Sequence, residues 1–240
     1  MKYTEKYKVK WHDTDASRRV RPSEMLVYMQ ETANLQFVSH GRDLDSERDK
    51  DGYAFILSKI CIDVHAPLYA YEDIEVETFT CESRGFSFNR CFRILRGGEV
   101  IAEALSVWAL INIRDAKLIR AEVYDVGFEN EPILCPAAPL RIKMPPADSF
   151  SECGKRRIVY SDIDYNMHMN NTHYPDMLCD YLPLADVERI RGISLSYLHE
   201  AAYGDRISVW GVKRESGYLF RTFNEKGEVC LEAQIELDPA

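Results

Sequence analysis

Apolar residues recur at three- and four-residue steps between residues 22 and 40, and this spacing predicts an amphipathic helix. Pro22 stands at a favoured first helical position, and Gly41 is a typical stop signal. The charged segment 42–51 that follows is expected to be a loop. Four runs rich in Ile, Val, Phe and Thr then predict strands over 54–64, 74–81, 86–95 and 100–113, with a Gly-Gly hairpin turn between the last two.

The second half of the chain repeats this order. We expect a strand over 157–160, a polar motif, a helix over about 171–181, strands over 192–198, 207–214, 218–224 and 228–237, and a hairpin turn at 224–227. Five of the ten prolines fall in 132–146, which indicates a stiff connection. The pattern predicts an α+β fold of two tandem modules, each a curved antiparallel sheet around a central helix. The expected boundaries are 1–131 for the first module, 132–149 for the connection and 150–240 for the second module.

An ungapped internal repeat supports this division, because repeats fix the architecture of a chain. Residues 8–22 align with residues 157–171, so that Asp13 falls on Asp162, Asp15 on Asp164, Ser17 on Asn166 and Arg19 on His168. Only the second copy carries an amide and an imidazole. We therefore expect a shared structural frame that is chemically equipped in the second module alone.

Asp164, Asn166 and His168 alternate in sequence with Tyr165 and Met167. In an extended segment, the three polar side chains would share one face. A carboxylate, an amide and an imidazole in one place can hold a water and polarise a carbonyl, which suits a hydrolase or another acid-base enzyme. The alternative is an Asx-rich loop that caps a helix, because Asp and Asn favour turns and N-caps.

Composition narrows the class of protein. The net charge of −9 disfavours non-specific binding to nucleic acid, which needs a basic surface. No apolar run approaches the roughly 18 residues of a membrane span, and no apolar stretch follows the basic N-terminus as in a secretory signal. The seven cysteines contain no Cys-x-x-Cys pair, which indicates reduced thiols and no metal site. We therefore expect a cytoplasmic protein.

Residues 164–171 resemble the Asp-x-Asn-x-His-x-Asn-Asn motif of the acyl-acyl carrier protein (acyl-ACP) thioesterases of bacteria and plant plastids. The block 195–201 is similar to that family's segment ending in a Glu-Cys pair, with Glu200 at the glutamate and Ala201 in place of the cysteine. The runs 30–33 and 77–79 also look like family signatures. The resemblance implies two fused hotdog domains, no cofactor, and hydrolysis of fatty acyl-ACP to free fatty acid in fatty acid biosynthesis.

The resemblance also implies a set of catalytic residues, namely Asp164, Asn166, His168 and Glu200. A thioester carbonyl needs an attacking water, a base for its proton, and donors for the developing oxyanion. Glu200 would be the base and Asn166 would help to hold the water, with His168 as the alternative base. Because residue 201 is not a cysteine, water attack is favoured over a cysteine nucleophile. Asn170 and Asn171, at the start of the predicted helix, would supply N–H groups to the oxyanion.

Two basic clusters stand beside the two copies of the repeat, namely Arg18, Arg19 and Arg21, and Lys155, Arg156 and Arg157. An acidic acyl carrier protein could dock on them, and the alternative is solvated loop charge. Within the same fold, an acyl-CoA thioesterase and a non-catalytic acyl-chain binding protein are the competing functions, since function lies in the site rather than in the fold. A homodimer is a further expectation.

Overall fold

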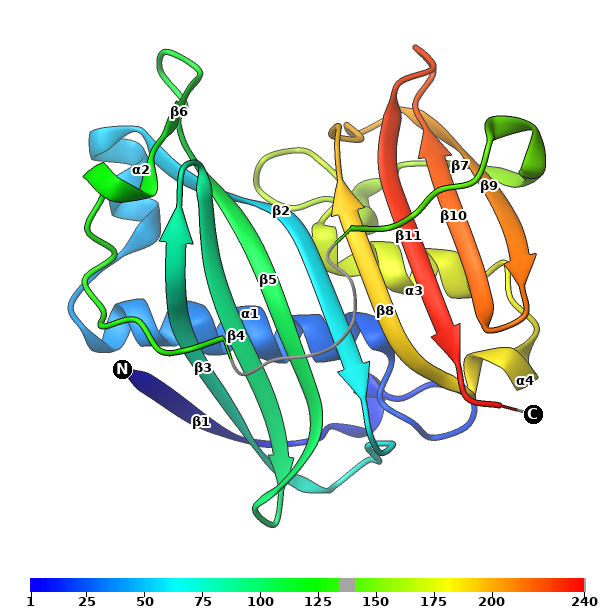
Figure 1. Ribbon diagram of the computed structural model, residues 1–240, viewed down its shortest axis with the longest axis horizontal. Helices are drawn as coiled ribbons and strands as arrows, with labels where there is room; N and C mark the ends of the chain where they lie inside the picture. The colour runs from blue at the N-terminus through cyan, green and yellow to red at the C-terminus, as the bar shows by residue number, and fades with distance from the viewer. Residues whose placement is uncertain (134–140, 240) are drawn as a thin grey trace.

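The computed structural model describes residues 1–133 and 141–239. A broad curved sheet forms one layer, and the helices lie behind it (Figure 1). The first half contains β1 (Lys2–Lys8), α1 (Pro22–Ser39), α2 (Leu44–Asp51), β2 (Tyr53–Val64), β3 (Asp73–Arg84), β4 (Ser87–Arg96), β5 (Glu99–Asn112) and β6 (Lys117–Ile119). The second half contains β7 (Ser151–Arg157), α3 (Tyr174–Cys179), α4 (Leu184–Val187), β8 (Ile190–Tyr197), β9 (Arg206–Arg214), β10 (Gly217–Phe223) and β11 (Val229–Leu237).

The described strands form one antiparallel sheet in the order β1-β3-β4-β5-β2-β8-β11-β10-β9-β7, with β6 paired to β5. The two halves meet where β2 pairs with β8, in a register that runs from Lys59 opposite Ser196 to Asp63 opposite Gly192. Each half thus contributes its own strands to one side of a central seam. The expected α+β architecture of two antiparallel modules is confirmed.

Helix α1 lies across the inner face of the first-half strands (Figure 1). Leu26 and Met29 are fully buried and Phe37 is nearly so, as the apolar spacing predicted. Thr32 and Gln36 on the same helix are also completely buried. The layer between α1 and the sheet therefore contains polar groups, which need partners inside the protein.

The segment 42–51, which the sequence predicted to be a loop, is largely the helix α2, so that prediction is wrong. Asp43 caps the helix by accepting the N–H of Asp45, and Gly52 closes it in a left-handed conformation at φ 79°. None of its residues is buried. The helix has no apolar stripe that a periodicity argument could detect.

Two predictions in the second half need correction. The strand expected over 157–160 is wrong in position, because β7 spans Ser151–Arg157 and residues 160–162 form a 3-10 turn held by the Asp162 carboxylate. The helix expected over 171–181 is a 3-10 turn at 171–173 followed by the short α3. The second central helix is therefore much shorter than α1.

The expected connection over 132–149 includes residues 134–140, which lie outside the described residues. Residues 147–149 form a short 3-10 turn before β7. The boundaries at 131 and 150 stay a prediction.

In the described part of the chain, no helix is long and apolar enough to cross a membrane.

Candidate active site

The polar motif is a tight turn, so the extended segment considered from the sequence is wrong. The backbone N–H of Asp164 donates to the carbonyl of His168 at 3.0 Å, and that of Met167 donates to the carbonyl of Asp164 at 3.0 Å. Met167 has a positive φ of 64°. The Asp164 carboxylate accepts the backbone N–H of Asn166 at 2.8 Å, and this local bond favours the turn over a strand.

The first copy of the repeat has the same turn. Asp15 N–H donates to the Arg19 carbonyl at 2.8 Å, Arg18 has a φ of 66°, and the Asp15 carboxylate accepts the Ser17 N–H at 2.8 Å. Each copy also begins with a buried aspartate that accepts a backbone N–H three residues earlier, Asp13 from Lys10 and Asp162 from Val159. The two copies of the repeat therefore have the same local hydrogen bonds, as expected for a shared structural frame.

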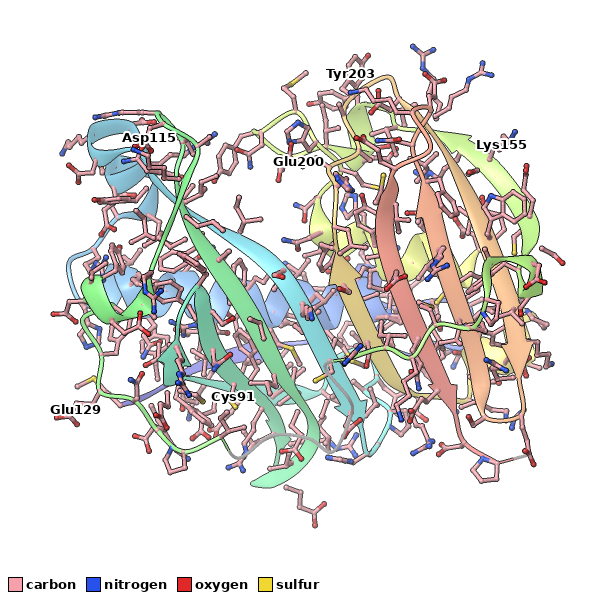
Figure 2. All side chains as sticks on the ribbon, turned by 45° about the horizontal axis from the view of Figure 1, so that its top comes forward. Cys91, Asp115, Glu129, Lys155, Glu200 and Tyr203 are labelled. Atoms are coloured by element: carbon pink, nitrogen blue, oxygen red, sulfur yellow. The ribbon has the colours of Figure 1, made fainter. Side chains whose placement is uncertain are left out.

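Glu200 meets His168 at the base of the second turn. The Nδ1 atom of His168 lies 3.2 Å from Oε2 of Glu200, with the side chains 33% and 66% exposed. The backbone aligns the two segments, since Met169 N–H donates to the Ala201 carbonyl at 2.8 Å and His168 forms a bridge with Ala202. Figure 2 shows Glu200 on the loop between β8 and β9. The sequence placed this glutamate with the motif only through the family resemblance.

Asp164 and Asn166 form a second pair. The Nδ2 atom of Asn166 lies 3.4 Å from Oδ2 of Asp164, in addition to the backbone bond. The four predicted residues therefore stand as two contacts, Asp164 with Asn166 and His168 with Glu200. Asp164 and His168 are joined through the backbone, since the Asp164 N–H donates to the His168 carbonyl.

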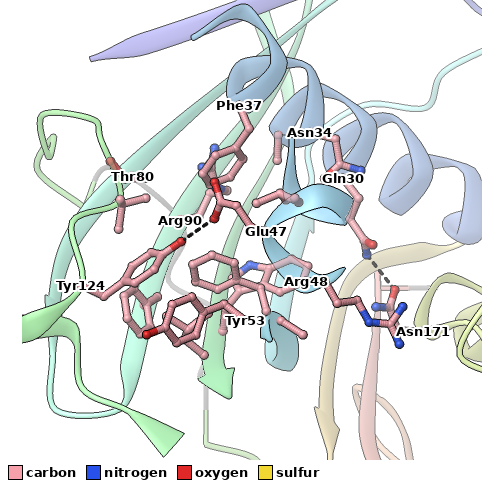
Figure 3. Close-up of a pocket in the computed structure, with 18 of the residues that line it drawn as sticks. Gln30, Asn34, Phe37, Glu47, Arg48, Tyr53, Thr80, Arg90, Tyr124 and Asn171 are labelled. Atoms are coloured by element: carbon pink, nitrogen blue, oxygen red, sulfur yellow. Dashed lines mark hydrogen bonds between the residues drawn. The ribbon is translucent and has the colours of Figure 1, made fainter. Parts of the chain in front are cut away.

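A cavity of about 350 Å³ opens beside the turn, between the two halves of the chain. The second half contributes Asp164, Tyr165, Asn166, Asn170 and Asn171. The first half contributes aromatic walls, namely Phe37, Tyr53, Phe55, Phe88, Trp108 and Tyr124 (Figure 3). A cavity lined by aromatic side chains and a small number of polar groups is typical of a site for a small, largely apolar ligand.

Asn170 and Asn171 have different partners. The Oδ1 atom of Asn170 accepts the backbone N–H of Thr172 at 3.0 Å, so that N–H group is already used within the protein. Asn171 Oδ1 accepts the Nε2 amide of Gln30 at 2.8 Å, and this bond links α1 of the first half to the motif of the second half (Figure 3). The bond leaves the Nδ2 group of Asn171 to donate elsewhere. The predicted oxyanion role of both residues stays a prediction.

Matches to known protein families identify the family of this chain. Residues 1–125 match the family described as the acyl-ACP thioesterase N-terminal domain, and residues 148–238 match the acyl-ACP thioesterase C-terminal domain. The chain belongs to the acyl-ACP thioesterase family.

The curated relatives of this acyl-ACP thioesterase family member are distant in sequence. A chloroplastic palmitoyl-acyl carrier protein thioesterase from Gossypium hirsutum is 19% identical over 213 residues, which is 82% of this chain and 52% of that protein. A chloroplastic acyl-[acyl-carrier-protein] hydrolase from Cuphea viscosissima is 22% identical over 214 residues, with the same coverage. The chain spans about half the length of these curated relatives.

Solved structures confirm the double hotdog fold. The crystal structure of an acyl-ACP thioesterase from Bacteroides thetaiotaomicron superposes with a TM-score of 0.89 at 22% identity, covering 99% of this chain and 98% of that one. The 12:0-ACP thioesterase from Umbellularia californica superposes with a TM-score of 0.85 at 18% identity, covering 100% and 98%.

Helix α2 also reaches the site of this family member, although the sequence pattern predicted a loop there. The Arg48 guanidinium lies over the ring of Tyr165, 4.7 Å from its centroid, and so connects α2 to the motif turn. The helix is anchored by Glu47, whose carboxylate accepts the Arg42 guanidinium and the Tyr124 hydroxyl at 2.8 Å. Only the observed helix brings these charged residues to the cavity, because their sequence pattern is that of a solvated loop.

The two basic clusters are partly engaged in contacts within the protein. Arg21 pairs with Glu24, Lys155 pairs with Glu152, the Arg156 guanidinium contacts the buried Asp162, and the Arg19 guanidinium donates to the Glu188 carbonyl. In Figure 2, Lys155 lies well apart from Glu200. These contacts reduce the positive charge that the clusters offer to a partner.

Cys230 lies close to the pair, with its sulfur 3.9 Å from the Glu200 carbonyl oxygen. The side chain is fully buried, and burial raises the pKa of the Cys230 thiol to about 11. A thiol in that state is a poor nucleophile, since the thiolate is the reactive form. Among the described residues, no group of three or more His, Cys, Asp and Glu side chains could hold a metal ion.

Proposed function

We propose that the protein hydrolyses the thioester of fatty acyl-ACP and releases the free fatty acid. The observation that carries the proposal is the contact between His168 and Glu200 at the motif turn. The other pair of that turn, Asp164 and Asn166, borders the aromatic cavity. Membership of the acyl-ACP thioesterase family supports the same reaction. The cavity would take the acyl chain, and the turn would stand at the thioester.

Water attack needs a base, and the His168–Glu200 pair supplies one. In the first assignment, the Glu200 carboxylate takes the proton of the water while His168 Nδ1, 3.2 Å away, holds that carboxylate. In the second, Glu200 fixes the imidazole and Nε2 takes the proton. Both assignments use the same contact. We favour Glu200 as the base, since its exposed carboxylate can reach a water directly.

Asp164 and Asn166 act on the other side of the reacting carbonyl in this proposal. The Asp164 carboxylate binds both the backbone and the side-chain amide of Asn166, and this fixes the amide beside the cavity. A fixed amide can position the water or donate to the oxyanion, and one such donor contributes roughly 3 to 4 kcal/mol to catalysis. Gln30 would fix the Asn171 amide in the same way.

We propose that the reaction forms no covalent enzyme intermediate. Ala201 stands next to the glutamate where the family segment has a cysteine. Cys230 is buried and has a raised pKa, so it cannot replace that cysteine at neutral pH. Water is then the remaining nucleophile at this site.

The proposed partner is an acyl carrier protein, an acidic protein that would approach the basic residues of the two clusters. In the described part of the chain, Arg18 and Arg157 have no ion pair, so they are the best candidates to contact the carrier. Reversing the charge of both should lower kcat/KM for acyl-ACP at low salt and have little effect at high salt, because steering is screened. An unchanged rate at low salt would identify both as solvated loop residues. A cytoplasmic location and a homodimer stay predictions.

The decisive experiment is a panel of acyl-ACP and acyl-CoA thioesters matched in chain length, with release of the free thiol as the readout. We expect hydrolysis of both and a higher kcat/KM for the carrier-bound substrates. A higher kcat/KM for the CoA esters would indicate an acyl-CoA thioesterase. Tight acyl binding without thiol release would indicate a non-catalytic acyl-chain binding protein.

A further inference from the structure

A buried arginine lines the cavity on its first-half side. Arg90, on β4, is only 6% exposed and lies opposite Thr80 of β3 and Ser106 of β5 in the sheet. Its Nη1 atom donates to the Gln36 side-chain oxygen at 2.6 Å and to the Thr78 hydroxyl at 3.1 Å. Both partners are neutral. A cation is unexpected in a cavity that would hold an alkyl chain.

The charge of Arg90 has no anionic partner among the described residues, where no carboxylate forms an ion pair with it. Two carboxylates line the cavity: Glu47 is occupied by Arg42 and Tyr124, and Asp164 is occupied by Asn166. Burial lowers the pKa of Arg90 to about 10, so the guanidinium is still charged at neutral pH. A buried charge without a counter-charge is costly, and an anionic ligand would relieve that cost.

Thr80 provides an independent observation at the same place. The residue is 5% exposed and lines the cavity, and its hydroxyl has no hydrogen-bond partner within the described residues. Buried polar groups are almost always paired, so a hydroxyl without a protein partner at a cavity wall can bind an oxygen-bearing group that enters the cavity. Because Thr80 and Arg90 are cross-strand neighbours, one oxygen-bearing group could contact both.

The two residues lie at the opposite end of the cavity from the catalytic motif. In Figure 3, Thr80 and Arg90 stand on one side together with the aromatic residues Phe37 and Tyr124, and Gln30 and Asn171 stand on the other side. A chain whose thioester is at the motif would therefore cross the aromatic section and point its far end at the arginine.

We propose that this cavity selects acyl chains that carry an oxygen-bearing group at their distal end, with a terminal carboxylate as the preferred group, bound by Arg90 and Thr80. The proposal rests on the proposed thioesterase function for the direction of the chain. The guanidinium would donate to the carboxylate, and the Thr80 hydroxyl would donate a further hydrogen bond. A terminal hydroxyl would make the same hydrogen bonds without the charge.

Measurements of ligand binding test this site without depending on catalysis. The probes are alkanamides and the matching amides with a terminal carboxylate, over a series of chain lengths, with a neutral amide in place of the thioester. By calorimetry, we expect the carboxylate-ended amides to bind about tenfold or more tightly than the plain ones, as for hydrogen bonds to charged groups. Equal binding of the two series, or weaker binding of the carboxylate series, would overturn the proposal.

Variants assign the effect to the two residues. Thr80→Val keeps the shape and should reduce the preference, whereas Arg90→Gln should abolish it and Arg90→Lys should retain part of it. Thr222→Val is the matched control, because Thr222 is another fully buried threonine whose hydroxyl lacks a partner, and it lies on β10 outside the cavity. If Arg90→Gln does not fold, Thr80→Val and Arg90→Lys carry the test, and a preference unchanged in both would overturn the proposal.

Measurements of turnover distinguish a failure of the distal site from a failure of the proposed thioesterase function. With acyl-ACP substrates of matched length, the wild type should hydrolyse carboxylate-ended chains with the highest kcat/KM, hydroxyl-ended chains next and plain chains last. Hydrolysis of all three at equal rates would leave the thioesterase function standing and refute the distal site. Preferential binding of carboxylate-ended amides without any hydrolysis would support the distal site and refute the thioesterase function.

Discussion

Replacing Glu200 by Gln is the sharpest test of the proposed catalytic pair. The substitution keeps the size of the side chain and removes the carboxylate that contacts His168 at 3.2 Å. Loss of a general base lowers the rate by about a hundred- to ten-thousandfold. We therefore expect kcat to fall by at least about a hundredfold, which corresponds to about 2.7 kcal/mol of transition-state stabilisation. His168→Ala should have an effect of the same order.

The structure predicts a much smaller effect of Glu200→Gln on stability. The two side chains of the pair are 33% and 66% exposed, so solvent screens their attraction. Exposed ion pairs contribute about 0 to 1 kcal/mol to folding. The loss in activation free energy should therefore exceed the loss in unfolding free energy severalfold. If Glu200 served only to hold the loop, the substitution would reduce transition-state stabilisation and folding stability together.

The assay measures kcat and KM with acyl-ACP beside thermal unfolding of each variant. Ser17→Ala and Arg19→Ala are the controls, because these residues hold the matching positions of the turn in the first repeat and do not line the cavity. Both should leave the chemical step nearly unchanged. Glu200→Gln with near wild-type turnover would refute the assignment of the base.

Three further predictions concern residues around the site. Gln30→Leu removes the 2.8 Å bond to Asn171, and the loss of about 1 kcal/mol should lower kcat about fivefold with little change in melting temperature; a fall in melting temperature alone would contradict a positioning role. Cys230→Ala should retain full turnover per folded molecule, and mass spectrometry should find no acyl group on any cysteine during turnover; an acylated cysteine would overturn water attack. Bonds from Arg42 lower the pKa of Glu47 below its ordinary value of 4.5, so its stabilisation is present above that value and is lost as pH falls through the folded pKa. The melting temperature of Glu47→Gln should therefore lie below that of the wild type at pH 7, and the difference should shrink in acid; a difference that does not change with pH would refute this contribution.

The parts of the fold that depend on hydrophobic spacing could be predicted from sequence. Helix α1 matches its prediction because its buried residues recur at helical steps, and β2 to β5 match because their apolar runs are long. The repeat predicted the shared frame, since Asp13 and Asp162 are needed at equal positions to bind the backbone. Helix α2 could not be predicted, because it is held by end caps and by Arg42 rather than by an apolar face.

The site was predictable in its residue types and not in its geometry. The motif 164–168 alternates as a strand would, and only the positive φ of Met167 and the local bonds of Asp164 reveal a turn. Gln30 was visible as part of a signature, yet its bond to Asn171 crosses the two halves. Arg90 reads as an ordinary charged residue of a strand. Its burial results from the packing of α1 on the sheet, which no local pattern records.

The pairing of β2 with β8 also affects how the protein folds and how it can aggregate. Each half presents a long central strand whose hydrogen-bonding edge is satisfied only by the other half. During synthesis the first half emerges alone, with β2 as an open edge that includes the apolar residues Ile60 and Ile62. Such edges pair readily with strands of other molecules. Either half made separately should therefore aggregate or pair with a copy of itself, whereas the intact chain closes both edges within one molecule.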